Sequence, residues 1–360
     1  MSENNSINKI NNTSAIPLSL KSIDEISSKK YIPSNKSNNL NKNEEQPGII
    51  EVYADNFVEE IKKLSSLLEE YNYIGMDTEY PGIVYYIQDM TNDFYYRTLK
   101  MNVDSLKLIQ LGVTLMNSKG EFPKNQKYHT WQFNFEFDKT KDKITQRSLN
   151  LLEGCGIDFN KLKNKGIKHR DFAEYFMISG LVLNPDIHWI SFHGCYDFGY
   201  LLKYLIYSNL PNTENEFLNL LDVYFINYYD IKTMVKRKDN LKIGLNKLAE
   251  SLEVLREGKT HQAGSDSVVT IDVYFKLIKS GVLGETNISN YKNLLFGINN
   301  EEDNKETITY EQFGNLLYQN NNTNNVIYSP YVNNFYYYFM NNNITQQNHN
   351  NPTQLSTFIK

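Results

Sequence analysis

The sequence predicts a mixed α/β fold, in which helices pack on both faces of one sheet in a single central domain between disordered ends. Three observations lead to this prediction. Asn-rich polar composition gathers at the two ends, three strand-like segments occur early in the central part, and later strands alternate with helical segments. Such a succession is typical of a mixed sheet covered by helices.

The two ends are too polar to form a core. Residues 1–48 contain few aromatic and branched aliphatic residues, so burial cannot offset the entropy of ordering, and we predict a disordered leader. Residues 298–360 return to the Asn-rich bias and add Tyr336 to Phe339, which predicts a largely disordered tail in which a docked strand or helix remains open. Residues 49–297 are left as one domain.

The first half of this domain is predicted to contain a helix and three strands. Apolar residues at three- and four-residue steps predict an amphipathic helix over 56–70. Strands are expected over 73–80, 108–116 and 128–137. The third strand alternates large aromatic residues, namely Trp131, Phe133, Phe135 and Phe137. This alternation predicts that one face of the strand packs on the core.

The second half alternates helices and strands. Helices are predicted over 170–182, 196–207, 242–256 and 265–280, and strands over 188–193 and 223–231. Three strands in succession, followed by strands that alternate with helices, are typical of a mixed sheet with helices on its faces. The sheet is therefore expected to be mixed.

Composition limits the classes of function. The chain carries 37 basic and 42 acidic residues, a net charge of −5, so any nucleic-acid site must be local. Two cysteines exclude a disulfide framework and a Cys-rich zinc site, and they fit a reducing compartment. Without a secretory signal or an apolar run of about 18 residues, the protein is expected in the cytoplasm, with the nucleus also open.

Asp77 and Glu79 are the first candidate site residues. They lie two apart in a predicted strand, so both carboxylates emerge on one face. Two carboxylates held together supply the hard oxygen ligands that Mg²⁺ and Mn²⁺ prefer. Taken alone, however, this short pattern also marks many solvated strand ends.

Asp197 is the second candidate. An apolar strand breaks at Gly194 and opens a helix that has Asp197 near its first turn. Ligands in open α/β sheets bind at such turns, but an Asp there can also simply stabilise the helix N-terminus. His193 and Cys195 are interpreted as packed core residues, because neither has metal-type spacing.

His261 and Asp266 form the third candidate segment. Gly264 and Ser265 mark a loop-to-helix boundary, which places Asp266 in the first helical turn and His261 before it. Imidazole titrates near neutral pH and can take a proton from a metal-bound water. Read by itself, the segment is only a loop with a helix cap.

The order and combination of these three segments resemble the His-containing branch of the DEDD exonuclease superfamily. The resemblance extends to one family, the Caf/Pop-type nuclease subunit of the Ccr-Not deadenylase complex, over about residues 49–297. The segments that carry it are 76–82, 98–104, 108–112, 130–135, 196–203 and 261–267. The ribonuclease H-like sheet of that family agrees with the fold expected from periodicity.

The resemblance also implies a mechanism. It makes Asp77, Glu79, Asp197 and Asp266 the ligands of two divalent cations, Mg²⁺ or Mn²⁺, and His261 the general base. The implied activity is 3′-to-5′ removal of poly(A) tails from mRNA with release of 5′-AMP. The implied partners are single-stranded RNA, the Ccr-Not scaffold subunit, a second deadenylase and RNA-binding adaptors.

Substrate contacts are harder to predict. Tyr80 stands where the family usually has Phe and could stack on a base. Lys232 begins a basic run with Lys236, Arg237, Lys238 and Lys242, for which a solvated surface is an equal alternative to RNA contact. Asp230 is interpreted as structural.

Two other functions stay open. The first is a DEDD exonuclease that acts on other RNA or DNA 3′ ends. The second is a bridging subunit with a vestigial site, although a non-catalytic protein has no reason to retain four mutually repelling carboxylates.

Overall fold

The computed structural model describes residues 48–298, apart from residues 88–92, 125, 240–242, 257 and 282–287. The side chains of residues 236–239 are also not described. The predicted leader and tail therefore lie almost entirely outside the described residues, and their disorder stays a prediction.

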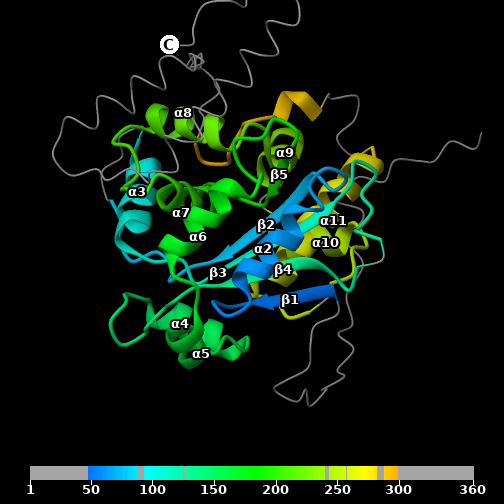
Figure 1. Cartoon of the computed structure of the whole chain (residues 1–360). Coiled ribbons are helices and arrows are strands. Elements are labelled where there is room, and N and C mark those ends of the chain that lie inside the picture. The colour runs from blue at the N-terminus through cyan, green and yellow to red at the C-terminus, as the bar shows by residue number, and fades with distance from the viewer. Residues whose placement is uncertain are drawn as a thin grey trace, which may run out of the picture. The chain divides into compact units, whose positions relative to one another are not determined.

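The described residues form one mixed sheet of six strands (Figure 1). The strands are β1 (Gly48–Val52), β2 (Tyr73–Glu79), β3 (Gln110–Met116), β4 (Tyr128–Asn134), β5 (His188–Ser191) and β6 (Tyr228–Asp230). Their order is β1-β4-β3-β2-β5-β6. The pairs β2–β3 and β3–β4 are antiparallel, and the other pairs are parallel.

Helices cover both faces of this sheet, as predicted. On one face the main core is formed with α2 (Phe57–Ser65), α3 (Phe94–Ser105), α6 (His169–Ile178), α7 (Cys195–Leu205) and α8 (Glu214–Tyr224). On the other face the core includes α9 (Ile231–Asp239), α10 (Leu245–Ser251), α11 (Ala263–Lys279) and the short 3-10 helix η1 (Ile288–Tyr291). Ile74 and Met76 of β2 point into the first core, whereas Gly75 faces α11.

A helical hairpin packs at the end of β4 with a small core of its own. It consists of α4 (Gln146–Gly154) and α5 (Phe159–Lys165). Phe137, Phe159 and Leu162 are buried in this core. No bilayer-spanning helix occurs among the described residues.

The predicted strand over 223–231 is wrong at its start. Its first two residues end α8, and the strand itself spans only Tyr228–Asp230. Thr213 and Glu216 form a capping box, which starts a helix whose buried residues recur at helical spacing as far as Tyr224. The aromatic and β-branched residues at this end gave a misleading strand pattern.

Other segments differ in extent or were not predicted. β1, α3, α4, α5, α8 and α9 were not expected from periodicity, and the predicted strand over 128–137 ends at Asn134. The aromatic face of β4 is buried as expected, but Thr130, Gln132 and Asn134 on the opposite face are buried as well. β4 is therefore covered on both sides, with α11 among the contacting elements.

Candidate active site

β2 presents Asp77 and Glu79 on the face that is covered by α11. The strand alternation puts both carboxylates on the same side as Gly75, where a Cβ would lie 2.6 Å from the Ile271 Cβ of α11. Asp77 pairs in register with Gly112 of β3, and Glu79 pairs with Gln110. The two predicted ligands thus share one face of the sheet, as expected.

α11 approaches the sheet closely because glycines face it. A Cβ on Gly112 would lie 1.9 Å from the Ala263 carbonyl oxygen, so only glycine fits there. The Ser267 hydroxyl lies 2.7 Å from the Thr114 hydroxyl of β3, and both side chains are buried. These contacts bring the first turn of α11, which contains Asp266, toward β2.

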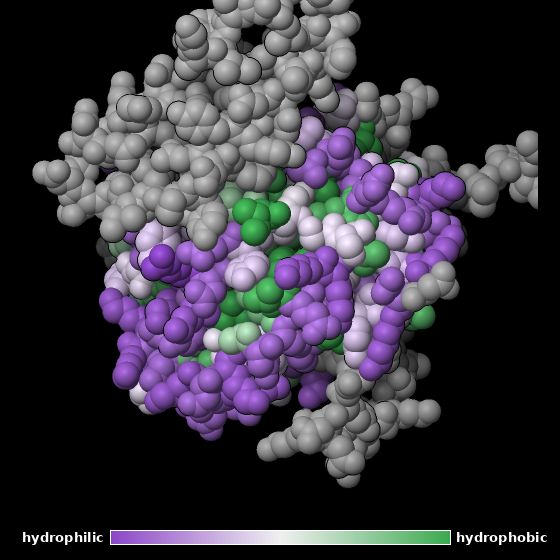
Figure 2. Space-filling model, viewed as in Figure 1, coloured by the Kyte–Doolittle hydropathy of each residue, from purple (hydrophilic) through white to green (hydrophobic). Residues whose placement is uncertain are grey.

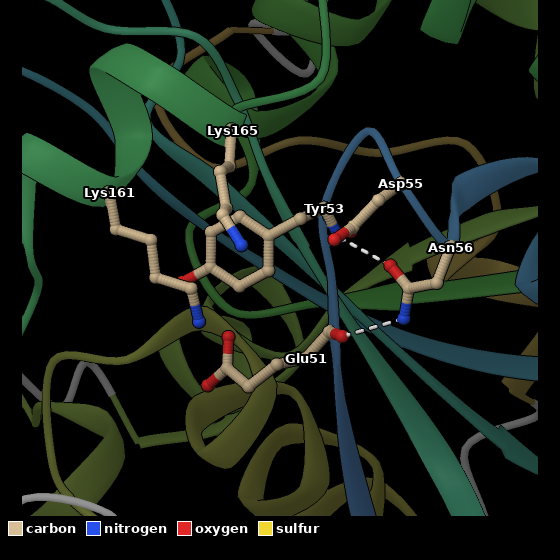
Figure 3. A pocket seen from close by; sticks show the side chains of 6 residues that line it. All are labelled: Glu51, Tyr53, Asp55, Asn56, Lys161 and Lys165. Atoms are coloured by element: carbon tan, nitrogen blue, oxygen red, sulfur yellow. Dashed lines mark hydrogen bonds between the residues drawn. The ribbon is translucent and has the colours of Figure 1, made fainter.

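Side-chain amides also hold the start of α11. The Gly264 N–H donates to Gln132 Oε1 at 2.8 Å, and the Ala263 N–H donates to Gln110 Oε1 at 3.5 Å. The Gln110 amide in turn donates to Asn134 Oδ1 at 2.8 Å. Gln132 Nε2 and Asn134 Nδ2 then donate to the two Glu51 carboxylate oxygens on the edge strand β1, at 2.7 Å each. We call this set the amide relay. Glu51 also lines a pocket beside α5 together with Tyr53 and Lys161 (Figure 3).

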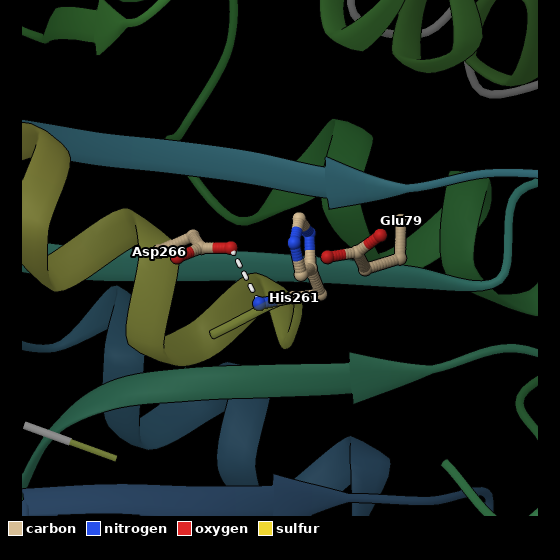
Figure 4. Close-up of side chains that lie close together, drawn as sticks. All are labelled: Glu79, His261 and Asp266. Carbon is tan, nitrogen blue, oxygen red and sulfur yellow. Dashed lines mark hydrogen bonds between the residues drawn. The ribbon is translucent and has the colours of Figure 1, made fainter. Parts of the chain in front are cut away.

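His261 lies between two of the predicted ligands. Ligand atoms of Glu79, His261 and Asp266 all lie within 4.8 Å of one another, and the imidazole stands between the carboxylates (Figure 4). The backbone of His261 has φ = 58°, and its N–H donates to Asp266 Oδ2 at 3.1 Å. A left-handed backbone at a non-glycine residue costs about 1–3 kcal/mol and is common at functional sites.

Arg256 holds the other oxygen of Asp266. Its guanidinium forms an ion pair with Asp266 Oδ1 and donates to the Ser265 hydroxyl at 3.1 Å. It also reaches Asn246 Oδ1 at 2.5 Å. Both carboxylate oxygens of Asp266 are thus engaged, which fixes its orientation at the start of α11.

Asp197 approaches β2 from the opposite face. It is buried in the first turn of α7, and the Thr78 hydroxyl donates to its Oδ1 at 2.6 Å. Asp77 and Asp197 are not part of the group within 4.8 Å, but the charges of Asp197, Asp266 and Glu79 all act on Asp77. The structure therefore gathers all five predicted residues at one end of β2, with three of them in direct proximity.

Burial and mutual repulsion favour protonated carboxyl groups at this site. Burial, followed by the charges of Asp266, Asp197 and Glu79, raises the pKa of Asp77 well above its usual range. Burial and the charges of Asp266 and Asp197 raise the pKa of Glu79 to about 8. Burial raises the pKa of Asp197 to about 7, although the hydrogen bond from Thr78 opposes the rise.

These residues fit a divalent cation. Four carboxyl groups and one imidazole supply oxygen and nitrogen ligands, and burial together with the neighbouring acidic charges favours protons on Asp77 and Glu79. A divalent cation would replace those protons and relieve the repulsion. Arg256 is the described cation that already pairs with the cluster.

In the absence of divalent cations, the free energy of unfolding should fall as pH rises from about 5 to about 8. The folded state keeps a proton on Glu79 up to about pH 8, whereas the unfolded chain releases it near the ordinary pKa of 4.5. The folded state therefore binds more protons across this interval, and stability decreases with pH. Urea unfolding in chelator and in MgCl₂ would measure the effect, which Mg²⁺ should reduce.

Glu79→Gln is the matched control for this pH dependence. It removes the titrating group and keeps the shape of the side chain, so its stability should vary less between pH 5 and 8. An equally steep dependence in wild type and variant would contradict the origin that we assign to it.

The two predicted substrate contacts lie in packed surroundings. Tyr80 is half-buried, with its ring stacked on Tyr196 at 5.2 Å between centroids and tilted against Tyr200 at 5.5 Å. The Lys232 ammonium contacts the Ile243 carbonyl and lies 5.4 Å from the centroid of the Phe192 ring. Their contact with substrate stays a prediction, and the side chains of Lys236, Arg237, Lys238 and Lys242 lie outside the described residues.

Asp230 binds backbone N–H groups of three segments, in agreement with its interpretation as a structural residue. Its carboxylate accepts the N–H groups of His193 (2.7 Å), Lys232 (2.9 Å) and Phe296 (2.9 Å). It therefore joins the end of β5, the start of α9 and the segment after η1. Cys195 is fully buried, as expected for a core residue. The interpretation of His193 as a core residue is wrong, because its side chain is exposed at the strand-to-helix turn, where its backbone has φ = 64°.

Sequence reasoning missed four residues that orient the site. Arg256 falls at the end of the predicted helix over 242–256, whereas the structure ends α10 at Ser251 and places Arg256 in the loop that follows. Thr78 alternates with Asp77 and Glu79 along the strand, which indicates only that it points to the opposite face. Gln110 and Gln132 belong to segments that carry the family resemblance, but nothing in the spacing indicated that they would bind the start of α11. Buried amides on a strand are the signal that could have found them, because such groups need partners.

A mixed sheet with this acidic centre at the end of an inner strand defines a cation-dependent α/β enzyme. The profile of the CAF1 family ribonucleases matches residues 52–179. The probable CCR4-associated factor 1 homolog 7 of Arabidopsis thaliana is 44% identical over 257 residues, which cover 69% of this chain and 93% of that protein. The chain therefore belongs to the CAF1 family of ribonucleases.

Two further relatives support this assignment. Poly(A) ribonuclease pop2 of Schizosaccharomyces pombe is 40% identical over 253 residues, which cover 69% of this chain and 75% of that protein. The solved S. pombe Pop2p, in a form with bound Mg²⁺ and Mn²⁺, has a TM-score of 0.67 and covers 70% of this chain and all of its own. Yeast CAF1 crystallised with the NOT1 MIF4G domain is 29% identical, with a TM-score of 0.60, over 69% of this chain and 96% of its own. The predicted fold class and the prediction of a ribonuclease are confirmed.

Proposed function

We propose that this chain is a 3′-to-5′ exoribonuclease that shortens the poly(A) tails of mRNA and releases 5′-AMP. The observation that carries the proposal is the convergence of Glu79, His261 and Asp266 within 4.8 Å, with Asp77 on the same strand face. The poly(A) ribonuclease of S. pombe, at 40% identity, supports the choice of substrate.

Asp77, Glu79, Asp197 and Asp266 would hold two divalent cations, Mg²⁺ or Mn²⁺. Bound there, such cations activate a water and neutralise the leaving 3′-oxygen of a phosphodiester. Asp77 and Glu79 approach from the α11 face of β2, and Asp197 approaches from the α7 face beside Thr78. The bound form of S. pombe Pop2p supports the choice of metals.

His261 would accept the proton of the attacking water on a ring nitrogen. Its side chain is exposed, while its backbone is tied to Asp266. The ring can therefore reorient toward a water at the carboxylates without losing its anchor. Histidine is the side chain that most often acts as a general base in enzymes, which suits this role.

The chain would act as the catalytic subunit of a Ccr-Not-type complex, in the cytoplasm and also in the nucleus. The crystal structure of yeast CAF1 with the NOT1 MIF4G domain supports a scaffold partner. Co-purification of the full chain with a NOT1 MIF4G domain tests this part of the proposal. Recovery of the chain without the domain would contradict it.

The activity is tested with the full chain and a 5′-labelled RNA that ends in adenylates. Stepwise shortening with Mg²⁺ or Mn²⁺, release of 5′-AMP and loss of both in chelator are the expected results. Equal cleavage of uridylate or deoxyadenylate ends would indicate a general DEDD exonuclease. No cleavage under any condition would favour a bridging subunit.

A further inference from the structure

The segment between β4 and α6 has a charge opposite to that of the whole chain. Residues 138–170 contain nine lysines and arginines and four acidic residues, a net charge of +5, whereas the chain carries −5. This segment forms the hairpin of α4 and α5. Hydrophilic residues cover the surface over these two helices (Figure 2).

Both ends of α4 are tied to segments that carry the predicted site residues. At its start, the Thr145 N–H donates at 3.0 Å to the carbonyl of Pro81, two residues after Glu79. At its end, the Cys155 carbonyl accepts a bond of 2.9 Å from Gln262, the neighbour of His261. α4 therefore runs along one side of the candidate active site.

Two positively charged side chains lie near the opposite ends of this helix. Arg147 is exposed in the first turn of α4. Lys259 is exposed near the far end, where its Nζ lies 3.2 Å from the position of a Cβ on Gly156. Neither side chain forms an ion pair with the described residues. Leu151, one turn after Arg147, is 43% exposed and leaves an apolar surface between them.

Several other lysines of the hairpin are already engaged. Lys139 pairs with Glu153 at 2.5 Å, and Lys163 pairs with Asp138 at 3.0 Å. The Lys161 ammonium lies 3.9 Å from the centroid of the Tyr53 ring in the pocket beside β1 (Figure 3). Arg147 and Lys259 are therefore better placed than these lysines to bind an external anion.

We propose that the exposed face of α4, with Arg147 at one end and Lys259 at the other, binds the backbone of single-stranded RNA upstream of the 3′ end. This inference rests on the proposed function. A nine-residue helix is about 14 Å long, so the face offers more than one phosphate site. The positive charges of Arg147 and Lys259 attract an approaching polyanion to this side of the candidate active site.

The inference is tested by the salt dependence of binding. Fluorescence anisotropy of a labelled oligoadenylate with the full chain in chelator measures affinity without cleavage. Each lost phosphate contact on single-stranded nucleic acid lowers the slope of log affinity against log salt by about 0.7. The double variant Arg147→Gln/Lys259→Gln should therefore lower the slope by about 1.4, and each single variant by about half of that.

Lys62→Gln/Lys276→Gln is the control with the same loss of charge. Both lysines are exposed, Lys62 on α2 and Lys276 ten residues after Asp266 on α11, about 15 Å along the helix. This control should keep the wild-type slope. All four substitutions replace exposed side chains. If a double variant fails to fold, the single variants are measured in its place.

The outcomes separate this inference from the proposed function. If wild type shortens oligoadenylate but the α4 variants bind with the control slope, the α4 surface is wrong and the proposed function stands. If the slope falls as expected but no 5′-AMP is released, the surface stands and the proposed function is wrong. Absence of any oligoadenylate binding by wild type overturns the surface.

Discussion

Asp77→Ala is expected to lose at least about a thousandfold in the rate of 5′-AMP release from oligoadenylate. Asp77 shares a strand face with Glu79, and the charges of three other acids act on it. Cations at such a site supply several kcal/mol of transition-state stabilisation, and each ~1.4 kcal/mol is a factor of ten in rate. Initial rates at saturating Mg²⁺ measure the loss.

The same substitution should not lower the free energy of unfolding of the metal-free protein, although it abolishes the activity. Removing a buried carboxyl group that others repel relieves an unfavourable interaction, so the urea midpoint in chelator should stay close to wild type or rise. Stabilisation by Mg²⁺ should shrink, because one ligand is missing. Asp171→Ala, which removes an exposed acid from the first turn of α6, is the matched control and should keep its activity. More than a tenth of the wild-type rate in Asp77→Ala would refute its role as a ligand.

Gly112→Ala should destabilise the protein by about 2–3 kcal/mol or more and disable the site as well. The new Cβ would lie 1.9 Å from the Ala263 carbonyl oxygen and 2.6 Å from the Gly264 nitrogen, which are backbone atoms that no side-chain rotation can move. The start of α11 must therefore shift, and Asp266 and His261 must shift with it. Urea unfolding and Mg²⁺ titration calorimetry measure the two effects.

Gly154→Ala is the matched control for this effect. A Cβ on Gly154, in the last turn of α4, meets no atom within 4 Å. A glycine-to-alanine change at such a position is expected to stabilise by up to about 1 kcal/mol. Equal unfolding midpoints for the two variants would show that the close approach of α11 does not constrain residue 112.

The sequence predicted the site best where local geometry alone decides it. Asp77 and Glu79 share a face because side chains alternate along any strand, whatever packs against it. Gly264 and Ser265 indicated the start of a helix, and Asp266 and His261 lie on either side of that start as expected. These positions need no knowledge of the tertiary structure.

Contacts between distant segments could not be predicted in this way. The bond from Thr78 to Asp197 spans 119 positions and depends on how α7 packs at the end of β2. Arg256 reaches Asp266 from the loop after α10, a segment that was predicted to be the end of a helix. Their roles follow from packing and become visible only in the structure.

Parts of the fold were missed for a similar reason. β1 is a five-residue edge strand whose parallel partner, β4, follows more than seventy residues later. In α4 only Leu152 is fully buried, so its apolar period is weak. α8 is different, because its Thr213–Glu216 capping box was present in the sequence as a local signal and was not used.

The amide relay makes the catalytic end of α11 depend on a residue at the rim of the sheet. Both carboxylate oxygens of Glu51 accept a hydrogen bond, so Gln132 and Asn134 direct their NH₂ groups toward this residue. Their carbonyl ends must then face inward, where Gln132 receives Gly264 N–H and Asn134 receives the amide of Gln110. The two acceptor oxygens of one carboxyl group at the outer terminus thereby set the polarity of the whole chain of amides.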